Sequence, residues 1–129
     1  MENDNSTHLY FNTRDELLKV PLSQVIYFEA EGNYTSIYFR NGLQSQVLAS
    51  LHTIEDLISN SFKLQNQDEH LAFIRIGRRY IVNIEYIYHI NIPKQKLLLS
   101  DFVFTQAYEL NVSKEALKNL KNIYSPKQK

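Results

Sequence analysis

Residues 73–87 read Phe-Ile-Arg-Ile-Gly-Arg-Arg-Tyr-Ile-Val-Asn-Ile-Glu-Tyr-Ile and carry the clearest fold signal in the sequence. Two runs rich in Ile, Val and Tyr flank the triplet Gly77-Arg78-Arg79. β-Branched and aromatic residues favour strands, and a glycine between two such runs favours a turn. The stretch therefore predicts two strands joined by a turn that carries adjacent guanidinium groups at its tip. The side chains expected in the core are those of Ile74, Ile76, Tyr80, Val82 and Ile84.

The rest of the chain repeats this pattern of short apolar runs between polar breaks. With nine Tyr and seven Phe, the runs have strand length rather than helix length. Asn41-Gly42 predicts a type I′ hairpin turn, because both residue types tolerate positive φ. Besides 73–76 and 80–82, the expected strands are residues 8–11, 16–20, 25–28, 34–39, 44–49, 86–92, 96–99, 102–104 and 107–112.

Two segments predict helices. In the first, residues 51–58, apolar side chains recur on one side after Ser50, a suitable N-cap. The second follows Ser113, another N-cap residue, and presents an apolar stripe of Leu117, Leu120 and Tyr124. We expect the polar stretch 59–71 to be a loop with Phe62 pointing inward.

The order of these elements predicts a mainly β domain. The strands do not alternate with helices, so a parallel sheet is not expected. The 129 residues, of which 43% are hydrophobic, suit one domain with a core of its own. We expect a single domain over residues 1–129.

Several classes of protein are excluded or disfavoured. The chain has no cysteine, which excludes disulfide scaffolds and thiolate metal sites. Its three glycines are too far apart for a nucleotide-binding loop, and its four histidines are scattered. Glu29 and Glu31 could pair for acid–base work, but a hydrogen-bonding or solvated strand edge is the better interpretation. We expect no enzyme, no cofactor and no metal site. The N-terminus lacks a signal-peptide pattern, which predicts a cytoplasmic protein.

Charge is divided unevenly along the chain. The net formal charge is zero, yet residues 1–70 have a balance of −6 and residues 71–129 a balance of +6. Such a chain can form a basic face while staying neutral overall. The alternative is two solvated faces of opposite sign that attract each other within the fold.

Two long stretches resemble the LytTR family of bacterial DNA-binding domains. Residues 25–35, Val-Ile-Tyr-Phe-Glu-Ala-Glu-Gly-Asn-Tyr-Thr, are similar to the family pattern I-x-Y-I-E-A-x-G-N-Y. Residues 73–87 are similar to F-x-R-I-H-R-S-Y-I-V-N-x-x-x-I. A third segment, residues 110–116, matches L-P-V-S-R-R-Y weakly. The resemblance extends over residues 14–123.

The resemblance implies a fold and a partner. The fold would be an elongated arrangement of small antiparallel sheets with one short helix between them and a C-terminal helix. The partner would be double-stranded DNA, entered by loops in successive major grooves. Two copies would bind repeated sites, with at most a weak homodimer, and regulate transcription as the output of a two-component system. Since few residues precede the match, we expect no receiver domain here, and either a stand-alone regulator or an excised C-terminal piece.

The resemblance also implies DNA-binding residues, which fall in three places. The first holds Asn33 and Thr35, although Gly32-Asn33 also predicts a turn and Tyr34 a core residue. The second surrounds Gly77, where the family usually has His, and the third lies at the start of the last helix. The implied residues are Asn33, Thr35, Arg75, Arg78, Arg79, Lys114, Glu115 and Lys118.

Within this set, Arg78 occupies the slot that contacts a base, and arginine is the commonest reader of guanine edges. Arg79 and Lys114 are expected to hold phosphates, and Asn83 to fix a turn. Glu115 stands where the family often has Arg. This acid and the zero net charge favour the alternative function, a protein-interaction or ligand-sensing module on the same fold without DNA affinity.

Overall fold

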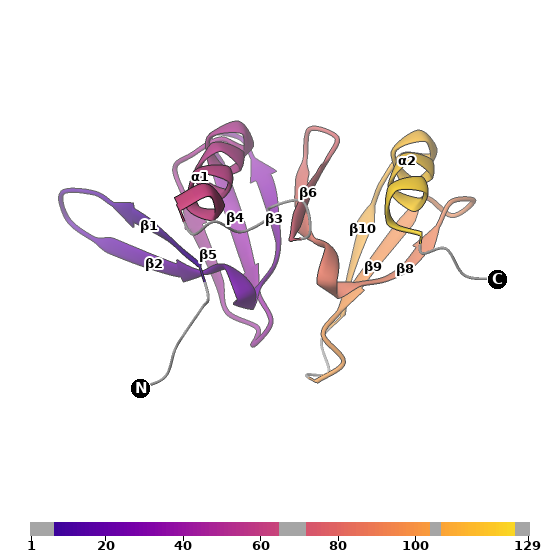
Figure 1. Ribbon diagram of the computed structural model, residues 1–129, viewed down its shortest axis with the longest axis horizontal. Coiled ribbons are helices and arrows are strands. Elements are labelled where there is room, and N and C mark those ends of the chain that lie inside the picture. The colour runs from indigo at the N-terminus through magenta and orange to yellow at the C-terminus, as the bar shows by residue number, and fades with distance from the viewer. Residues whose placement is uncertain (1–6, 65–71, 104–106, 126–129) are drawn as a thin grey trace.

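The computed structural model describes residues 7–64, 72–103 and 107–125 (Figure 1). Most of the described chain forms short strands, as the sequence predicts. The strands are β1 (His8–Asn12), β2 (Leu17–Pro21), β3 (Val25–Glu31), β4 (Tyr34–Phe39), β5 (Gln44–Val47), β6 (Phe73–Ile76), β7 (Tyr80–Asn83), β8 (Ile87–Asn91), β9 (Lys96–Ser100) and β10 (Ala107–Asn111). The helices are α1 (Leu51–Leu64) and α2 (Lys114–Tyr124), and short 3₁₀ turns cover Leu22–Gln24 and Ile84–Tyr86.

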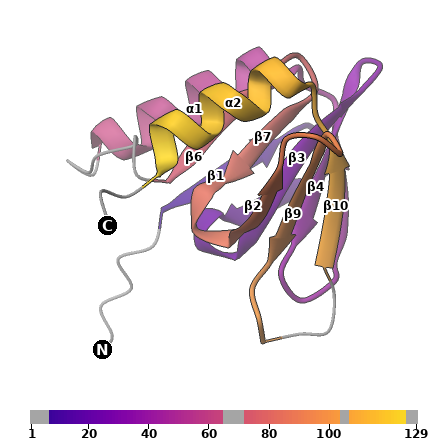
Figure 2. The ribbon, with the colours of Figure 1, turned by 90° about the vertical axis from the view of Figure 1, so that its right-hand side faces the viewer.

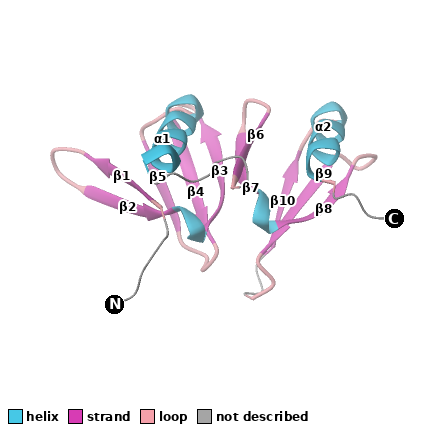
Figure 3. Ribbon diagram, in the orientation of Figure 1, coloured by secondary structure: helices cyan, strands magenta, loops and turns pink. Residues whose placement is uncertain are grey.

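The described strands form three sheets, and every pair is antiparallel. The central sheet has the order β5-β4-β3-β7-β6. A two-stranded sheet, β1-β2, and a three-stranded sheet, β10-β9-β8, flank it in an elongated arrangement (Figure 3). The expectation of a mainly β fold made of small antiparallel sheets is therefore confirmed.

The inner strands β3 and β7 of the central sheet are buried on both faces, which explains the apolar run at the start of β3. Phe28 belongs to one core and Tyr27 to the other. The register shifts between Val25 and Tyr27, as at a bulge, so that two consecutive residues, Ile26 and Tyr27, share one core. A strand covered on both sides has no solvated face and needs no polar alternation.

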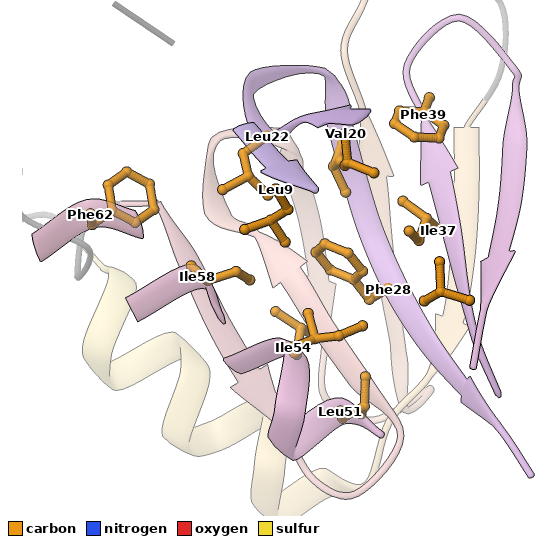
Figure 4. Packing of buried hydrophobic residues seen from close by; sticks show 13 residues of the cluster. Leu9, Val20, Leu22, Phe28, Ile37, Phe39, Leu51, Ile54, Ile58 and Phe62 are labelled. Carbon is orange, nitrogen blue, oxygen red and sulfur yellow. The ribbon is translucent and has the colours of Figure 1, made fainter. Parts of the chain in front are cut away.

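The first core lies between the central sheet, the β1-β2 hairpin and α1 (Figure 4). Its buried side chains include Leu9 and Val20 from the hairpin and Phe28 and Ile37 from the sheet. Helix α1 contributes Leu51, Ile54, Ile58 and Phe62. The helix is capped as predicted, because the Ser50 hydroxyl accepts a 3.1 Å hydrogen bond from the Thr53 N–H.

The second core joins the opposite face of the central sheet to the three-stranded sheet and α2. Tyr27 stacks on Tyr38 with ring centroids 4.4 Å apart, and the edge of Tyr108 from β10 meets Tyr27 at 5.4 Å. Desolvation by burial raises the pKa of Tyr27 well above its usual range. An ion pair of 3.1 Å between Arg40, in the β4–β5 hairpin, and Asp101, at the end of β9, also connects the central sheet with the three-stranded sheet.

Two of the predicted elements differ from the structure. Helix α1 continues to Leu64, whereas residues 59–71 were expected to form a loop. Ile58 and Phe62, four residues apart, extend the buried stripe by one turn, while residues 65–71 lie outside the described chain. The expected strand 102–104 is also absent at Phe102 and Val103, and Phe104 is not described. The Ser100 hydroxyl and the Asp101 carboxylate accept from the N–H groups of Phe102 and Val103, which turns the chain away from β9.

The hairpin between β4 and β5 forms, but not with a type I′ turn. Of the two residues Asn41 and Gly42, only Gly42 has a positive φ, of 91°. The Gly42 N–H donates to the Phe39 carbonyl at 3.0 Å, and the Asn41 side chain accepts from the Leu43 N–H at 3.0 Å. The loop therefore has three residues, with glycine alone in the left-handed region, as in the common bulged hairpin.

Candidate nucleic-acid interface

Segments that are far apart in the sequence meet at one edge of the molecule. The β3–β4 turn, the β6–β7 turn and the beginning of α2 lie toward the same edge (Figure 2). The Ala30 N–H donates to the Arg79 carbonyl at 2.8 Å, which joins the first two segments. A groove lined by Gly77, Ala116 and Asn119, among others, joins the second to the third. We call these three segments the turn edge.

The β6–β7 turn is held rigidly from its N-terminal side. Gly77 has a φ of 63°, a conformation that L side chains adopt only under strain. The Arg75 Nε donates to the Gly77 carbonyl at 2.9 Å, and its Nη1 lies 2.8 Å from a Glu55 carboxylate oxygen. Arg75, which was expected to contact DNA, thus links the β6–β7 turn to Glu55 of α1.

Arg79 is paired on the other side of the turn. Its Nε and Nη2 lie 2.9 and 2.7 Å from the same carboxylate oxygen of Glu29, on β3. The guanidinium also lies over the Tyr80 ring, 5.6 Å from its centroid. Hydrogen bonding to Glu29 is the main cause that raises the pKa of Arg79. The acid thus serves as a hydrogen-bonding strand residue, one of the two interpretations that its sequence position left open.

Arg78, between these two arginines, is exposed. It makes no hydrogen bond or ion pair with any other described residue. Among the described residues, Arg78 therefore projects an unpaired guanidinium from a turn that is held on both sides by its neighbours Arg75 and Arg79. The support fixes the backbone position from which the Arg78 side chain projects, and recognition of a base edge depends on such a fixed position.

The β3–β4 turn presents one predicted contact and buries the other. Gly32 has a φ of 66°, and Asn33 is exposed at the tip. Thr35 has no exposed surface, and its hydroxyl donates to the Ala49 carbonyl at 2.7 Å. The expectation that Thr35 contacts DNA is therefore wrong for its side chain. Tyr34, expected in the core, is 46% exposed, so the adjacent positions exchange the faces predicted for them.

The first turns of α2 supply the remaining predicted contacts. The Ser113 hydroxyl accepts from the Ala116 N–H at 3.2 Å, which confirms the N-cap. Lys114, Glu115 and Lys118 are all exposed, while Leu117 and Leu120 anchor the helix in the second core. The first turns of the helix thus carry two exposed cations and one exposed acid, while its residues Ala116 and Asn119 line the groove shared with the β6–β7 turn.

The connection between the predicted strands 86–92 and 96–99 is a turn that lies next to α2, a place that was not predicted. Gln95, between β8 and β9, has a φ of 57°, and its carbonyl accepts from the Val112 N–H at 3.1 Å. Lys94 in this turn is exposed. Asn91 and Pro93, flanking residues typical of turns, would have located it, but nothing in the sequence placed it beside the helix.

Asn83 fixes the end of β7, as predicted. Its side chain donates to the Val25 carbonyl at 2.9 Å and accepts from the Glu85 N–H at 3.0 Å. The basic face that the division of charge allows is interrupted beside the β6–β7 turn. Glu29 on β3 and Glu55 on α1, both from the acidic half of the chain, pair there with Arg79 and Arg75.

Comparison with known proteins identifies the family. The model of the LytTr DNA-binding domain matches residues 15–125. The chain belongs to this family. The resemblance found in the sequence is therefore confirmed, and the protein is a DNA-binding domain of the kind that regulates transcription.

A solved LytTr domain has a similar structure. It is the LytTr DNA-binding domain of a Bacillus cereus protein described as a methyl-accepting/DNA response regulator. The TM-score is 0.61 at 23% sequence identity, and the match covers 93% of this chain and 98% of the other. At this identity the likeness supports the LytTr fold. A search among curated proteins gave no match. Neither helix in the described part of this LytTr chain is long and apolar enough to cross a membrane.

Proposed function

We propose that this LytTr domain recognises a specific double-stranded DNA sequence through the turn edge and acts in the bacterial cytoplasm as a transcription regulator. The β6–β7 and β3–β4 turns would enter the major groove with Arg78 and Asn33. The start of α2 would contact the next stretch of backbone with Lys114 and Lys118. The observation that carries the proposal is Arg78, a guanidinium that has no polar partner in the described part of the chain and stands on a braced turn, since arginine pairs bidentately with guanine.

The start of α2 supports a contact with phosphate. Lys114 stands in the first helical turn, where free N–H groups and the helix dipole favour an anion. Glu115 beside it repels phosphate, or accepts a hydrogen bond from a cytosine amino group. Family resemblance further suggests that two copies bind repeated sites, with weak contact between them.

Selection of bound sequences from a random duplex library tests this function. Enrichment of one motif, with affinity that falls steeply as salt rises, supports a sequence-specific regulator. No enrichment and no salt-dependent binding would instead favour the interaction module without DNA affinity, which the zero net charge also allows.

Lys114→Ala should weaken binding to the selected and to a scrambled duplex alike. Loss of one phosphate contact should flatten the slope of log affinity against log salt by about 0.9. Fluorescence anisotropy across a salt series measures both effects. Lys19→Ala is the matched control, because Lys19 is exposed on β2, within the hairpin that flanks the opposite side of the central sheet (Figure 1). Equal slopes for the two variants would remove Lys114 from the interface.

A further inference from the structure

Glu29 pairs with an arginine of the candidate base-reading turn, and its own position is fixed. It lies on β3 directly opposite Tyr80, and its side chain is only 13% exposed. One of its carboxylate oxygens accepts a hydrogen bond from the Arg79 Nε and lies 2.7 Å from the Arg79 Nη2 in an ion pair. A carboxylate fixed by strand pairing can hold a long arginine side chain in one place.

The arginine that it holds stands next to Arg78 and remains 63% exposed along its side chain. Without Glu29, Arg79 would be a second free cation on the same turn. Adjacent free arginines would bind phosphate on any sequence, because phosphate contacts carry no sequence information.

From this geometry we infer that Glu29 is a positioning residue that withholds Arg79 from the DNA backbone and thereby limits sequence-independent affinity. The inference rests on the proposed function of the turn edge. It assigns to Arg79 a restrained state in place of the phosphate contact expected from the sequence. A domain that dwells less on arbitrary DNA keeps more of its copies free to reach the specific site.

Glu29→Gln tests the inference, because it removes the charge and keeps the shape. The variant should bind selected and scrambled duplexes more tightly by the same factor, and its salt slope should steepen by about 0.9, one phosphate contact. Its gain over the wild type should then be about 3.5 times larger at 50 mM salt than at 200 mM. The double variant Glu29→Gln/Arg79→Ala, which lacks both partners, should return to wild-type binding.

Glu31→Gln separates release of an arginine from simple loss of negative charge. Glu31 is exposed on the same strand and accepts a 3.4 Å hydrogen bond from the Gln46 amide, and it pairs with no arginine in the described part of the chain. It should give a smaller gain and a smaller change of slope than Glu29→Gln. Equal gains from the two variants, or a gain that survives in the double variant, would overturn the inference.

A measurement without DNA distinguishes this inference from the proposed function. In the free protein, the Nε–Hε NMR signal of Arg79 should relax as an ordered group and that of Arg78 as a mobile one. In Glu29→Gln, the Arg79 signal should become as mobile as that of Arg78. An Arg79 signal that stays ordered in the variant would overturn the inference, whereas failure of every variant to bind any duplex would refute the proposed function alone.

Discussion

Val82→Asp should prevent the domain from folding. Val82 has no exposed surface and lies on β7, paired with Tyr27 on one side and Ile74 on the other. An aspartate there would be surrounded by the apolar side chains of the second core. Burying an unpaired carboxylate costs several kcal/mol, which is comparable to the whole stability of about 5–15 kcal/mol of an ordinary domain.

Circular dichroism with thermal and urea unfolding checks this expectation. Val103→Asp is the matched control, because the same change is made at a valine that is 68% exposed. It should alter the free energy of unfolding by no more than about 0.5 kcal/mol. A cooperative transition for Val82→Asp near that of the wild type would contradict the assignment of β7 to the centre of the fold.

Arg78→Ala should abolish preference at one base pair of the selected site while leaving the fold intact. A bidentate contact between arginine and guanine contributes about 1–3 kcal/mol of discrimination, or about 5- to 150-fold in relative affinity. Because Arg78 is exposed and makes no hydrogen bond or ion pair with another described residue, its removal should change the melting temperature little. Affinities for the selected duplex and its single-base variants measure the effect.

Arg14→Ala provides the control for loss of an exposed arginine. Arg14 is 91% exposed in the β1–β2 hairpin and pairs only with its neighbour Asp15 in the described structure. It should leave affinity and base preference unchanged. Equal losses on selected and scrambled duplexes for Arg78→Ala would show that Arg78 contacts phosphate only, and a large loss of stability would make it a structural residue.

Local signals were enough to predict most strands and both helix starts. Gly77 between two β-branched runs marked the β6–β7 turn, and Ser113 marked the start of α2, because turn and cap chemistry depends on neighbouring residues only. The end of α1 was missed for the opposite reason. Ser59, Asn60 and Ser61 are poor helix formers. The last turn is stabilised by the burial of Phe62 in the first core, whose composition depends on tertiary packing.

The partners of the arginines could not be predicted from sequence. Glu29 and Arg79 are 50 positions apart, and they meet only because β3 and β7 pair in one particular register. The same holds for Arg75 and Glu55, joined by the packing of α1 on the sheet. The turn and the three arginines at it could be predicted from the sequence. Which arginine lacks a partner among the described residues depends on tertiary structure. Thr35 illustrates the same limit. Strand alternation predicts that Tyr34 and Thr35 point to opposite faces of the sheet, but it does not predict which of the two faces is buried.

The burial of β3 and β7 on both faces has a consequence for how the domain loses its structure. β3 and β7 contribute side chains to both cores, so neither flanking sheet can detach without exposing apolar surface of the strands that support the other. The domain should therefore open as one cooperative unit, with the amide hydrogens of β3 and β7 exchanging only through global unfolding. A partly unfolded form would not keep half of the turn edge. Binding capacity and folded population should then rise and fall together, as a single all-or-none quantity.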